Sequence, residues 1–259
     1  MKVRVLVLYG YGINCDFETR HGFELAGALA ERVHFNELIA GEKSLQDYQI
    51  LALPGGFSFG DDIGAGKVLA VKFKYHLKES LQNFIRKGNL VIGICNGFQV
   101  LVKLGLLPGI GGNYDSQLTT LSFNDSGRFE DRWVYLKAPD SCSPFTKGLE
   151  RLYLPVRHGE GKFLVKDRAV LKSLHKNRQV VLRYVDEKGR DLPGYPWNPN
   201  GSVDDIAGIC DETGRVFGLM PHPEGYLYRT NHPAWTREEL PREGLGLHIF
   251  KNAVNYFRG

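Results

Sequence analysis

The segment that most constrains the fold is an apolar run that ends in a cysteine flanked by glycines. Leu90–Ile94 has the length and composition of a buried strand, and Gly93-Ile94-Cys95-Asn96-Gly97 carries the chain out of it. Phe98, Leu101 and Val102 then recur at helical spacing. A strand that turns directly into a helix can project a nucleophile from the sheet edge, because small neighbours tolerate the strained turn. The segment therefore predicts an α/β fold in which a reactive thiol, that of Cys95, lies at the edge of the sheet.

The rest of the first half alternates short apolar runs with amphipathic stretches, which is the pattern of βαβ units. This order predicts that the first half forms the parallel part of the sheet. Strands are predicted at Val3–Tyr9, around Val33–Asn36 and at Gln49–Leu53. Helices are predicted where Phe17, Leu25, Ala28 and Leu29 recur, within Asp62–Phe73 after a loop, and between Tyr75 and Lys87.

The second half is richer in Tyr, Trp, Phe and Thr, and it has turn signals at 124–127 and 186–189. These features favour antiparallel strands. The Pro-rich stretch 191–201 is interpreted as an ordered loop, and 244–258 as a closing helix. We therefore predict an α/β fold with a single domain over residues 1–259, in which helices flank a mostly parallel central sheet with an additional antiparallel portion.

Composition narrows the classes of function. The 33 basic and 29 acidic residues leave a net charge of +4 without a polybasic tract, so nothing favours nucleic acid as a partner. No stretch approaches the roughly 20 apolar residues of a membrane span, and no signal-peptide cleavage site follows the first strand, so we expect a cytoplasmic protein. Cysteines 15, 95, 142 and 210 form no CxxC pair, so we expect reduced thiols and no metal site.

A thiol nucleophile needs a base, and Pro221-His222-Pro223-Glu224 supplies one after the apolar run Val216–Met220. The prolines exclude a helix interior, and in an extended segment residues two apart face the same way. Glu224 would then orient the imidazole of His222, which would exchange a proton with Cys95. The expected position of Cys95 at a helix N-terminus favours its thiolate. These three residues are the predicted catalytic triad.

An acyl-transfer site also needs hydrogen-bond donors for the oxyanion. The backbone N–H groups of Gly55, Gly56 and Asn96 are the candidates, since Pro54-Gly55-Gly56 ends a predicted strand and Asn96 follows the nucleophile. A tight turn would require the same two glycines, so the sequence leaves both interpretations open.

The combination of Pro54-Gly55-Gly56, the Cys95 elbow and His222-Pro223-Glu224 resembles the class I (triad) glutamine amidotransferases. Three further segments are similar to one branch of that family, the glutaminase subunits or domains of phosphoribosylformylglycinamidine synthase. They are Phe57-Ser58-Phe59-Gly60-Asp61, Asn124-Asp125-Ser126-Gly127-Arg128-Phe129 and Asn198-Pro199-Asn200-Gly201-Ser202. The resemblance covers nearly the whole chain.

The resemblance implies a flavodoxin-like fold and the hydrolysis of glutamine to glutamate and ammonia through a thioester on Cys95. It implies that Gln99, Arg128 and Phe129 contact glutamine. The ammonia would pass to a synthetase that converts formylglycinamide ribonucleotide to the amidine, with or without a small accessory subunit. Because this chain has no GxxxxGK[ST] loop, we expect it to bind no cofactor and the synthetase to bind ATP and Mg²⁺.

Two departures from the family pattern are visible. Gly64 stands where the family often has an arginine, and additional sequence at 166–188 and 229–243 makes the chain more like the glutaminase domain of the single-chain enzyme. Three other functions stay open: a glutaminase for a different acceptor, a cysteine hydrolase or peptidase on the same elbow, and an inactive scaffold that binds the synthetase. Gln99 and the His-Pro-Glu segment argue against the peptidase, and the complete triad argues against the scaffold.

Overall fold

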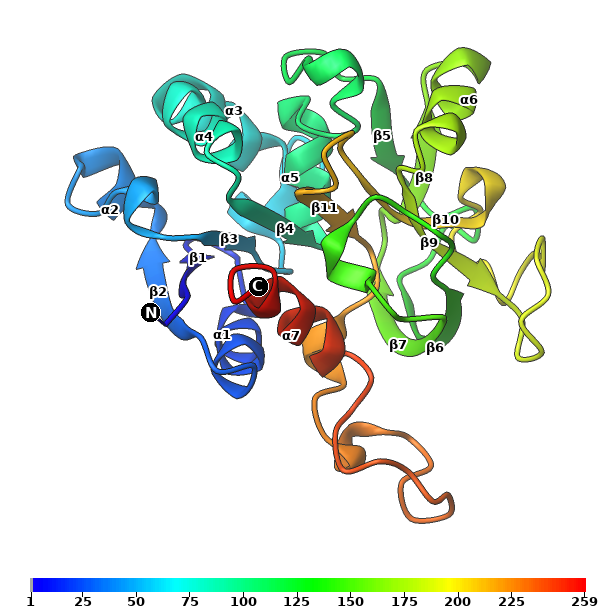
Figure 1. Cartoon of the computed structure of the whole chain (residues 1–259). Coiled ribbons are helices and arrows are strands. Elements are labelled where there is room, and N and C mark those ends of the chain that lie inside the picture. The colour runs from blue at the N-terminus through cyan, green and yellow to red at the C-terminus, as the bar shows by residue number, and fades with distance from the viewer. Residues whose placement is uncertain (1) are drawn as a thin grey trace.

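The fold is built on a 9-stranded sheet, and a 2-stranded sheet lies beside it (Figure 1). The computed structural model describes residues 2–259. The strands are β1 (Arg4–Tyr9), β2 (Leu29–His34), β3 (Ile50–Leu53), β4 (Leu90–Ile94), β5 (Thr119–Ser122), β6 (Glu130–Lys137), β7 (Arg151–His158), β8 (Lys162–Val165), β9 (Val180–Val185), β10 (Ile206–Cys210) and β11 (Val216–Leu219). The helices are α1 (Asp16–Leu25), α2 (Phe35–Ala40), α3 (Lys67–His76), α4 (Lys78–Arg86), α5 (Asn96–Leu104), α6 (Arg168–Lys176) and α7 (Leu247–Asn255).

The large sheet has a parallel half and an antiparallel half in one continuous order, β2-β1-β3-β4-β11-β10-β9-β6-β7. The pairs from β2 to β11 are parallel, and those from β11 to β7 are antiparallel. The predicted α/β class, with a parallel centre and an antiparallel portion, is confirmed. The last strand in the sequence, β11, lies between β4 and β10, so it joins the two halves.

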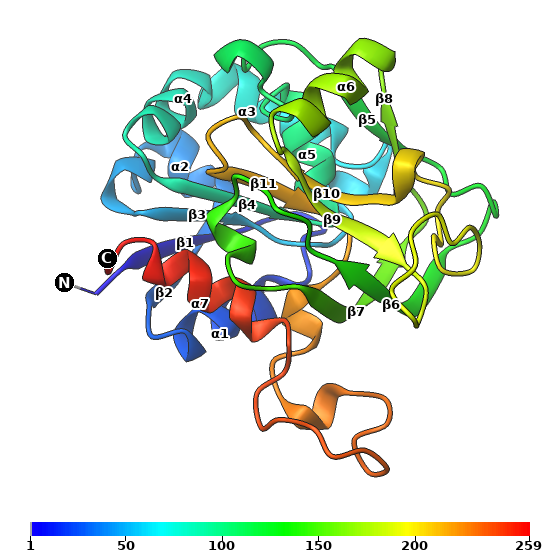
Figure 2. The same cartoon turned by 45° about the vertical axis from the view of Figure 1, so that its right-hand side comes forward.

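Helices cover both faces of the parallel half, which explains why its strands are apolar throughout. In the two views α1 and α7 lie against one face, and α3, α4 and α5 lie over the other (Figure 2). Every residue of β3, β4 and β11 is buried. A strand buried on both faces is stabilised by a continuous apolar run in place of an alternating one.

The first βα unit differs in detail from its prediction. Ala28 and Leu29 lie outside α1, and Leu29 instead begins β2, which ends at His34. Phe35 and Asn36 were expected in a strand but begin α2. The reason is local capping: the His34 ring accepts a hydrogen bond from the N–H of Asn36, and the Glu37 carboxylate accepts one from the N–H of His34. Such a capping box stabilises a helix start strongly enough to override a short apolar run.

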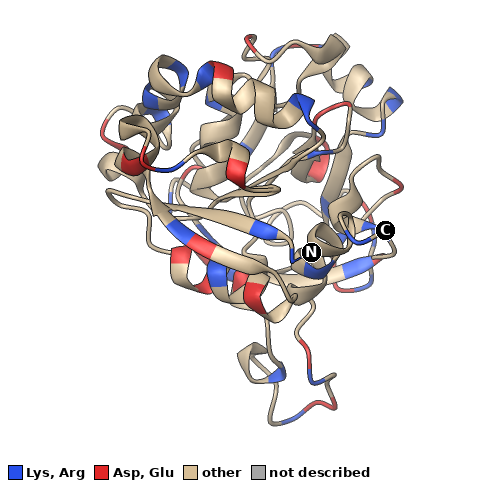
Figure 3. Cartoon of the chain, turned by 60° about the vertical axis from the view of Figure 1, so that its left-hand side comes forward, with Lys and Arg blue, Asp and Glu red and all other residues tan. Residues whose placement is uncertain are grey.

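The remaining surface has two general features. Lys and Arg are interspersed with Asp and Glu over much of the chain, although α3 and α6 carry basic residues only (Figure 3). The segment 229–243 extends away from the body of the protein below α7, with an antiparallel bridge between Tyr228 and Glu243 at its base. Over residues 2–259 the structure has no helix that combines the length and apolar character needed to cross a membrane.

The elbow depends on close packing of glycine backbones, and this generates a stability prediction. A Cβ on Gly97 would overlap the backbone carbonyl of Leu53. Helix propensity alone predicts that Gly97→Ala stabilises α5 by about 1 kcal/mol. We expect instead that overpacking lowers the free energy of unfolding by about 1–3 kcal/mol, measured by urea denaturation.

Gly10→Ala is the matched control for Gly97→Ala, because the nearest atoms to a Cβ on Gly10 lie at 3.8 Å, an ordinary contact. Its unfolding midpoint should stay close to that of the unchanged chain. A Gly97→Ala variant as stable as the Gly10→Ala variant would contradict the close approach between α5 and β3.

Candidate functional site

Cys95 lies between β4 and α5 in the strained turn that the sequence predicts. Its backbone has φ 51° and ψ −105°, a positive φ that costs free energy for any residue but glycine. The N–H of Cys95 donates to the carbonyl of Leu219 at 2.8 Å, and its carbonyl accepts from the N–H of Gln99 at 3.1 Å. A Cβ on Gly93 would lie 2.6 Å from the carbonyl oxygen of Gly97, so both glycines are needed for this turn.

His222 and Glu224 meet as expected, although the backbone between them differs from the prediction. His222 is extended, but Pro223–Gly225 form a 3₁₀ turn in place of the extended segment. Proline at the first position favours such a turn because its φ is already helical. The turn brings Nδ1 of His222 to 2.5 Å from Oε1 of Glu224. Both side chains are almost fully buried, so the pair is shielded from water.

Cys95 and His222 lie at one sheet edge because β4 and β11 are neighbouring parallel strands, whose carboxyl ends meet there. Sγ of Cys95 donates to the carbonyl of Arg157 at 3.6 Å, and Nε2 of His222 has no hydrogen-bond partner among the described residues. Gly55 lies between them: a Cβ there would be 2.8 Å from Cε1 of His222 and 3.5 Å from Cβ of Cys95. Burial disfavours a charge on His222, but the Glu224 carboxylate and the Cys95 thiol raise its pKa well above the ordinary value. The raised pKa favours the protonated form of His222.

A cavity of about 220 Å³ opens directly on Cys95. Of the residues predicted to bind or polarise a substrate, Gly56, Gln99 and Phe129 line it. The N–H groups of Gly55, Gly56 and Asn96 donate none of the backbone hydrogen bonds found outside the helices and strands of residues 2–259, so these predicted oxyanion donors stay candidates. Arg128 is exposed and does not line the cavity, although its carbonyl accepts from the side chain of Asn124.

The loop 57–66 is held to the first turn of α5 by the side chain of Asn96. Its Oδ1 accepts from the N–H of Ser58 at 3.2 Å, and its Nδ2 donates to Asp61 at 3.1 Å and to Gln99 at 2.9 Å. Phe59 and Asp61 have positive φ angles of 54°, so the loop stores backbone strain beside the cavity.

Gly64 in this loop has a cation beside it. A Cβ on Gly64 would lie 3.9 Å from Nζ of Lys103, and that ammonium donates to the carbonyl of Ala65 at 2.5 Å. Lys103 of α5 therefore lies beside Gly64, the position where the sequence departs from the family pattern.

The model of the CobB/CobQ-like glutamine amidotransferase domain matches residues 2–257. The PurQ subunit of phosphoribosylformylglycinamidine synthase from Dehalococcoides mccartyi is 51% identical over 258 residues, which are 99% of this chain and 98% of that subunit. The chain belongs to the PurQ family of glutamine amidotransferases. The PurQ subunit from Methanococcus maripaludis is 48% identical and covers 98% of this chain and 97% of that subunit.

Two solved structures are similar to this chain in fold. A chain of PurLQS from Thermotoga maritima superposes with a TM-score of 0.74 at 32% identity, covering 99% of this chain and all (100%) of that one. A glutamine amidotransferase from Thermotoga maritima, with a TM-score of 0.52 at 18% identity over 89% of this chain and 79% of that one, shares the fold alone. The segments 166–188 and 229–243 lie within the length matched by PurQ subunits, so they do not favour the single-chain enzyme that the sequence analysis expected.

Sequence reasoning gave no role to His158, which lines the same cavity of this PurQ-family chain. Its Nδ1 lies 3.1 Å from Oδ1 of Asn124, which also accepts from the N–H of Gly161, so Nδ1 carries the proton and Nε2 is an acceptor. The buried Nε2 has no partner in the described part of the chain. Burial and the nearby charge of His222 lower the pKa of His158 to about 3. A neutral histidine is therefore available to accept a hydrogen bond from a ligand.

Cys15 is a second residue that sequence reasoning left out of the site. It lies at the start of α1, and its Sγ would be 3.3 Å from a Cβ on Gly55. The spacing of the cysteines along the chain could not place this thiol beside His222, because only the β1–α1 turn and the Gly55 turn bring them together. Burial and the charge of Glu224 raise the pKa of Cys15, although its contact with His222 acts in the opposite direction.

The low pKa of His158 gives a prediction for stability against acid. Between pH 6.5 and about 3 the unfolded chain binds a proton on this histidine and the folded chain does not. Acid therefore favours unfolding in this range, with a slope of up to about 1.4 kcal/mol per pH unit from this group. His158→Gln removes this contribution. Between pH 6 and 4 the slope of the free energy of unfolding against pH should therefore fall by up to about 1.4 kcal/mol per pH unit.

The measurement is urea denaturation at a series of pH values, with the exposed His76→Gln as control. His76→Gln should keep the slope of the unchanged chain. A His158→Gln variant whose slope equals that of the control would show that His158 is protonated in the folded state.

Proposed function

We propose that this chain hydrolyses glutamine to glutamate and ammonia and delivers the ammonia to a synthetase that converts formylglycinamide ribonucleotide to formylglycinamidine ribonucleotide. The observation that carries the proposal is the thiol elbow of Cys95 beside the buried His222–Glu224 pair, in a chain that matches PurQ subunits over nearly their full length. The reaction belongs in the cytoplasm, where the thiol of Cys95 stays reduced.

In the first half of the reaction the thiolate of Cys95 attacks the side-chain amide carbon of glutamine. The carbonyl oxygen becomes an oxyanion, and the N–H groups of Gly55, Gly56 and Asn96 are its proposed hydrogen-bond donors. His222 gives its proton to the departing nitrogen, the C–N bond breaks, and ammonia leaves a glutamyl thioester on Cys95. The raised pKa of His222 suits this step because it favours the protonated form.

In the second half, neutral His222 takes a proton from water, which attacks the thioester carbon and releases glutamate and the thiolate. Glu224 accepts from Nδ1 of His222, which leaves Nε2 for proton transfer at Cys95. Glutamine itself would occupy the 220 Å³ cavity against Gln99 and Phe129, with its polar groups within reach of Nε2 of His158.

The proposed partner is a synthetase of the PurL kind, which the likeness to a chain of PurLQS supports. A small accessory subunit stays a prediction from the family resemblance. ATP and Mg²⁺ are assigned to the synthetase, since the sequence has no phosphate-binding GxxxxGK[ST] loop. This chain works without a cofactor of its own, because a thiol, an imidazole and backbone N–H groups suffice for acyl transfer.

Replacement of the nucleophile tests the proposal directly. In the complex with the synthetase, Cys95→Ala and Cys95→Ser should abolish glutamine-dependent synthesis, because no thioester forms. Synthesis from added ammonium salt should continue, since only the ammonia source is lost. Both rates are measured by formation of the amidine product.

Cys142→Ser is the matched control, because Cys142 lies outside the cavity that opens on Cys95. This substitution should leave both rates unchanged. Retention of glutamine-dependent synthesis by Cys95→Ala would remove Cys95 as the nucleophile. Loss of the ammonium-dependent rate as well would mean that the substitution disrupts the complex, and the assignment would then rest on Cys95→Ser.

A further prediction concerns activation by the partner. The strained loop 57–66 adjoins the N–H of Gly56, so docking of the synthetase can complete the oxyanion site by changing this loop. We expect kcat for glutamine hydrolysis to rise at least about tenfold when the synthetase and its ligands are added, with a smaller change in KM. A free chain that is as fast as the complex would refute activation through the loop and leave the triad assignment intact.

A further inference from the structure

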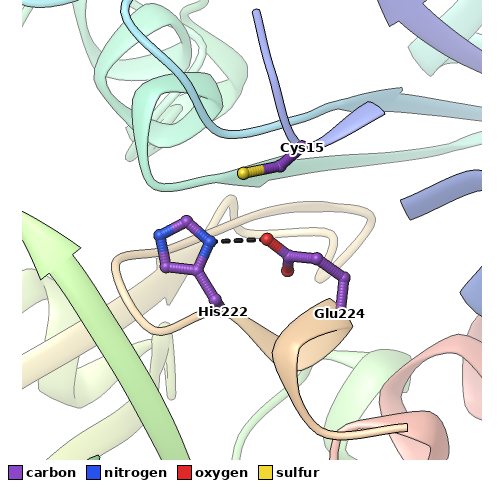
Figure 4. A group of neighbouring side chains, drawn as sticks. All are labelled: Cys15, His222 and Glu224. Atoms are coloured by element: carbon purple, nitrogen blue, oxygen red, sulfur yellow. Dashed lines mark hydrogen bonds and ion pairs between the residues drawn. The ribbon is translucent and has the colours of Figure 1, made fainter. Parts of the chain in front are cut away.

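A third side chain lies against the His222–Glu224 pair. Sγ of Cys15, a ring nitrogen of His222 and a carboxylate oxygen of Glu224 all lie within 4.8 Å of one another. Figure 4 shows the sulfur directed toward the imidazole, close to its hydrogen bond with Glu224. The missing side chain of Gly55 leaves room for this contact, because a Cβ there would be 3.3 Å from the sulfur.

The donor set is the one that zinc prefers. Thiolate, imidazole and carboxylate bind Zn²⁺ at about 2.0–2.3 Å, which places tetrahedral ligands about 3–4 Å apart. The three ligand atoms lie within 4.8 Å of one another, which is close to that spacing. The Nδ1 to Oε1 hydrogen bond must open as the metal replaces its proton.

The second oxygen of Glu224 is an independent indication of a ligand. Oε2 is buried and has no hydrogen-bond partner among the residues described, and the Glu224 side chain has 0% of its surface exposed. Buried carboxylate oxygens are rarely left without a partner, because loss of hydration is costly. A cation held by this carboxylate would compensate that loss.

We propose that Cys15, His222 and Glu224 form a binding site for Zn²⁺, and that its occupancy reversibly stops glutamine hydrolysis. Binding displaces the thiol proton of Cys15 and the proton between His222 and Glu224. The imidazole is then held by the metal and no longer transfers protons at Cys95. The inhibitory effect rests on the proposed glutaminase function, whereas the metal site itself does not.

The position of the site determines the kind of inhibition. The cavity assigned to glutamine is lined by Cys95, Gln99 and Phe129 but by none of the three proposed ligands. Zn²⁺ should therefore lower kcat and leave the KM for glutamine unchanged. A metal bound through Cys95 would instead block the cavity and raise KM.

Cobalt reports the ligands without any turnover. Co²⁺ bound to a thiolate has a charge-transfer absorption that Zn²⁺ removes by competition. The purified chain titrated with Co²⁺ should show this band, and Cys15→Ser should lack it. Cys142→Ser is the matched control. Cys142 lies away from the site, where its sulfur is 3.4 Å from that of Cys210. Its replacement removes one thiol of this close pair and should leave the cobalt band unchanged.

Inhibition of glutamine hydrolysis by Zn²⁺ is then measured for the unchanged chain and for the same variants, all in complex with the synthetase. The rate of each protein with Zn²⁺ is divided by its own rate without metal. Cys15→Ser and Cys15→Ala should raise the inhibitory Zn²⁺ concentration at least about tenfold, and a chelator should restore the rate. A cobalt band that survives in Cys15→Ser and disappears in Cys95→Ser would overturn the proposal. Absence of a band in the unchanged, folded chain would overturn it as well, whether or not the chain hydrolyses glutamine.

Discussion

The conformation of one residue, Cys95, supports the rest of the site. Its positive φ turns the chain from β4 into α5 and directs the thiol out of the sheet. The turn is stable only because Gly93 and Gly97 let α5 approach the backbone of β4 and of Leu53. Burial of apolar side chains on α5 and its neighbouring strands offsets the unfavourable free energy of the strained Cys95 backbone. The nucleophile, the N–H of Asn96 and the floor of the cavity are thus consequences of one packed junction.

Electrostatics gives the two buried histidines of the site different protonation preferences. His222 and His158 are both buried, yet the pKa of His222 is raised and that of His158 is lowered to about 3. The difference lies in their partners, since His222 faces the Glu224 carboxylate and His158 faces the neutral amide of Asn124. The raised pKa of one imidazole favours its protonated form, whereas the lowered pKa of the other favours a neutral acceptor.

Much of this arrangement could be predicted from the sequence where chemistry and local structure coincide. The glycines around Cys95 identify its strand-to-helix turn, and the prolines around His222 exclude a helix interior, so the positions of the predicted triad follow from the sequence. Cys15 and His158 could not be placed in the same way, because they reach the site only through strand order and the turn at Gly55. The 3₁₀ turn after His222 and the capped start of α2 were missed because both depend on single hydrogen bonds and not on periodicity.

The place of β11 in the sheet has a consequence for biosynthesis. This strand is the last to be translated, yet it is inserted between β4 and β10 and carries the chain to His222. A nascent chain that has already made Cys95 has neither the base nor the central strand that holds the two halves of the sheet together. Sheet closure over such a long sequence separation is slow and cooperative. Translation must therefore reach β11 before any molecule can consume glutamine.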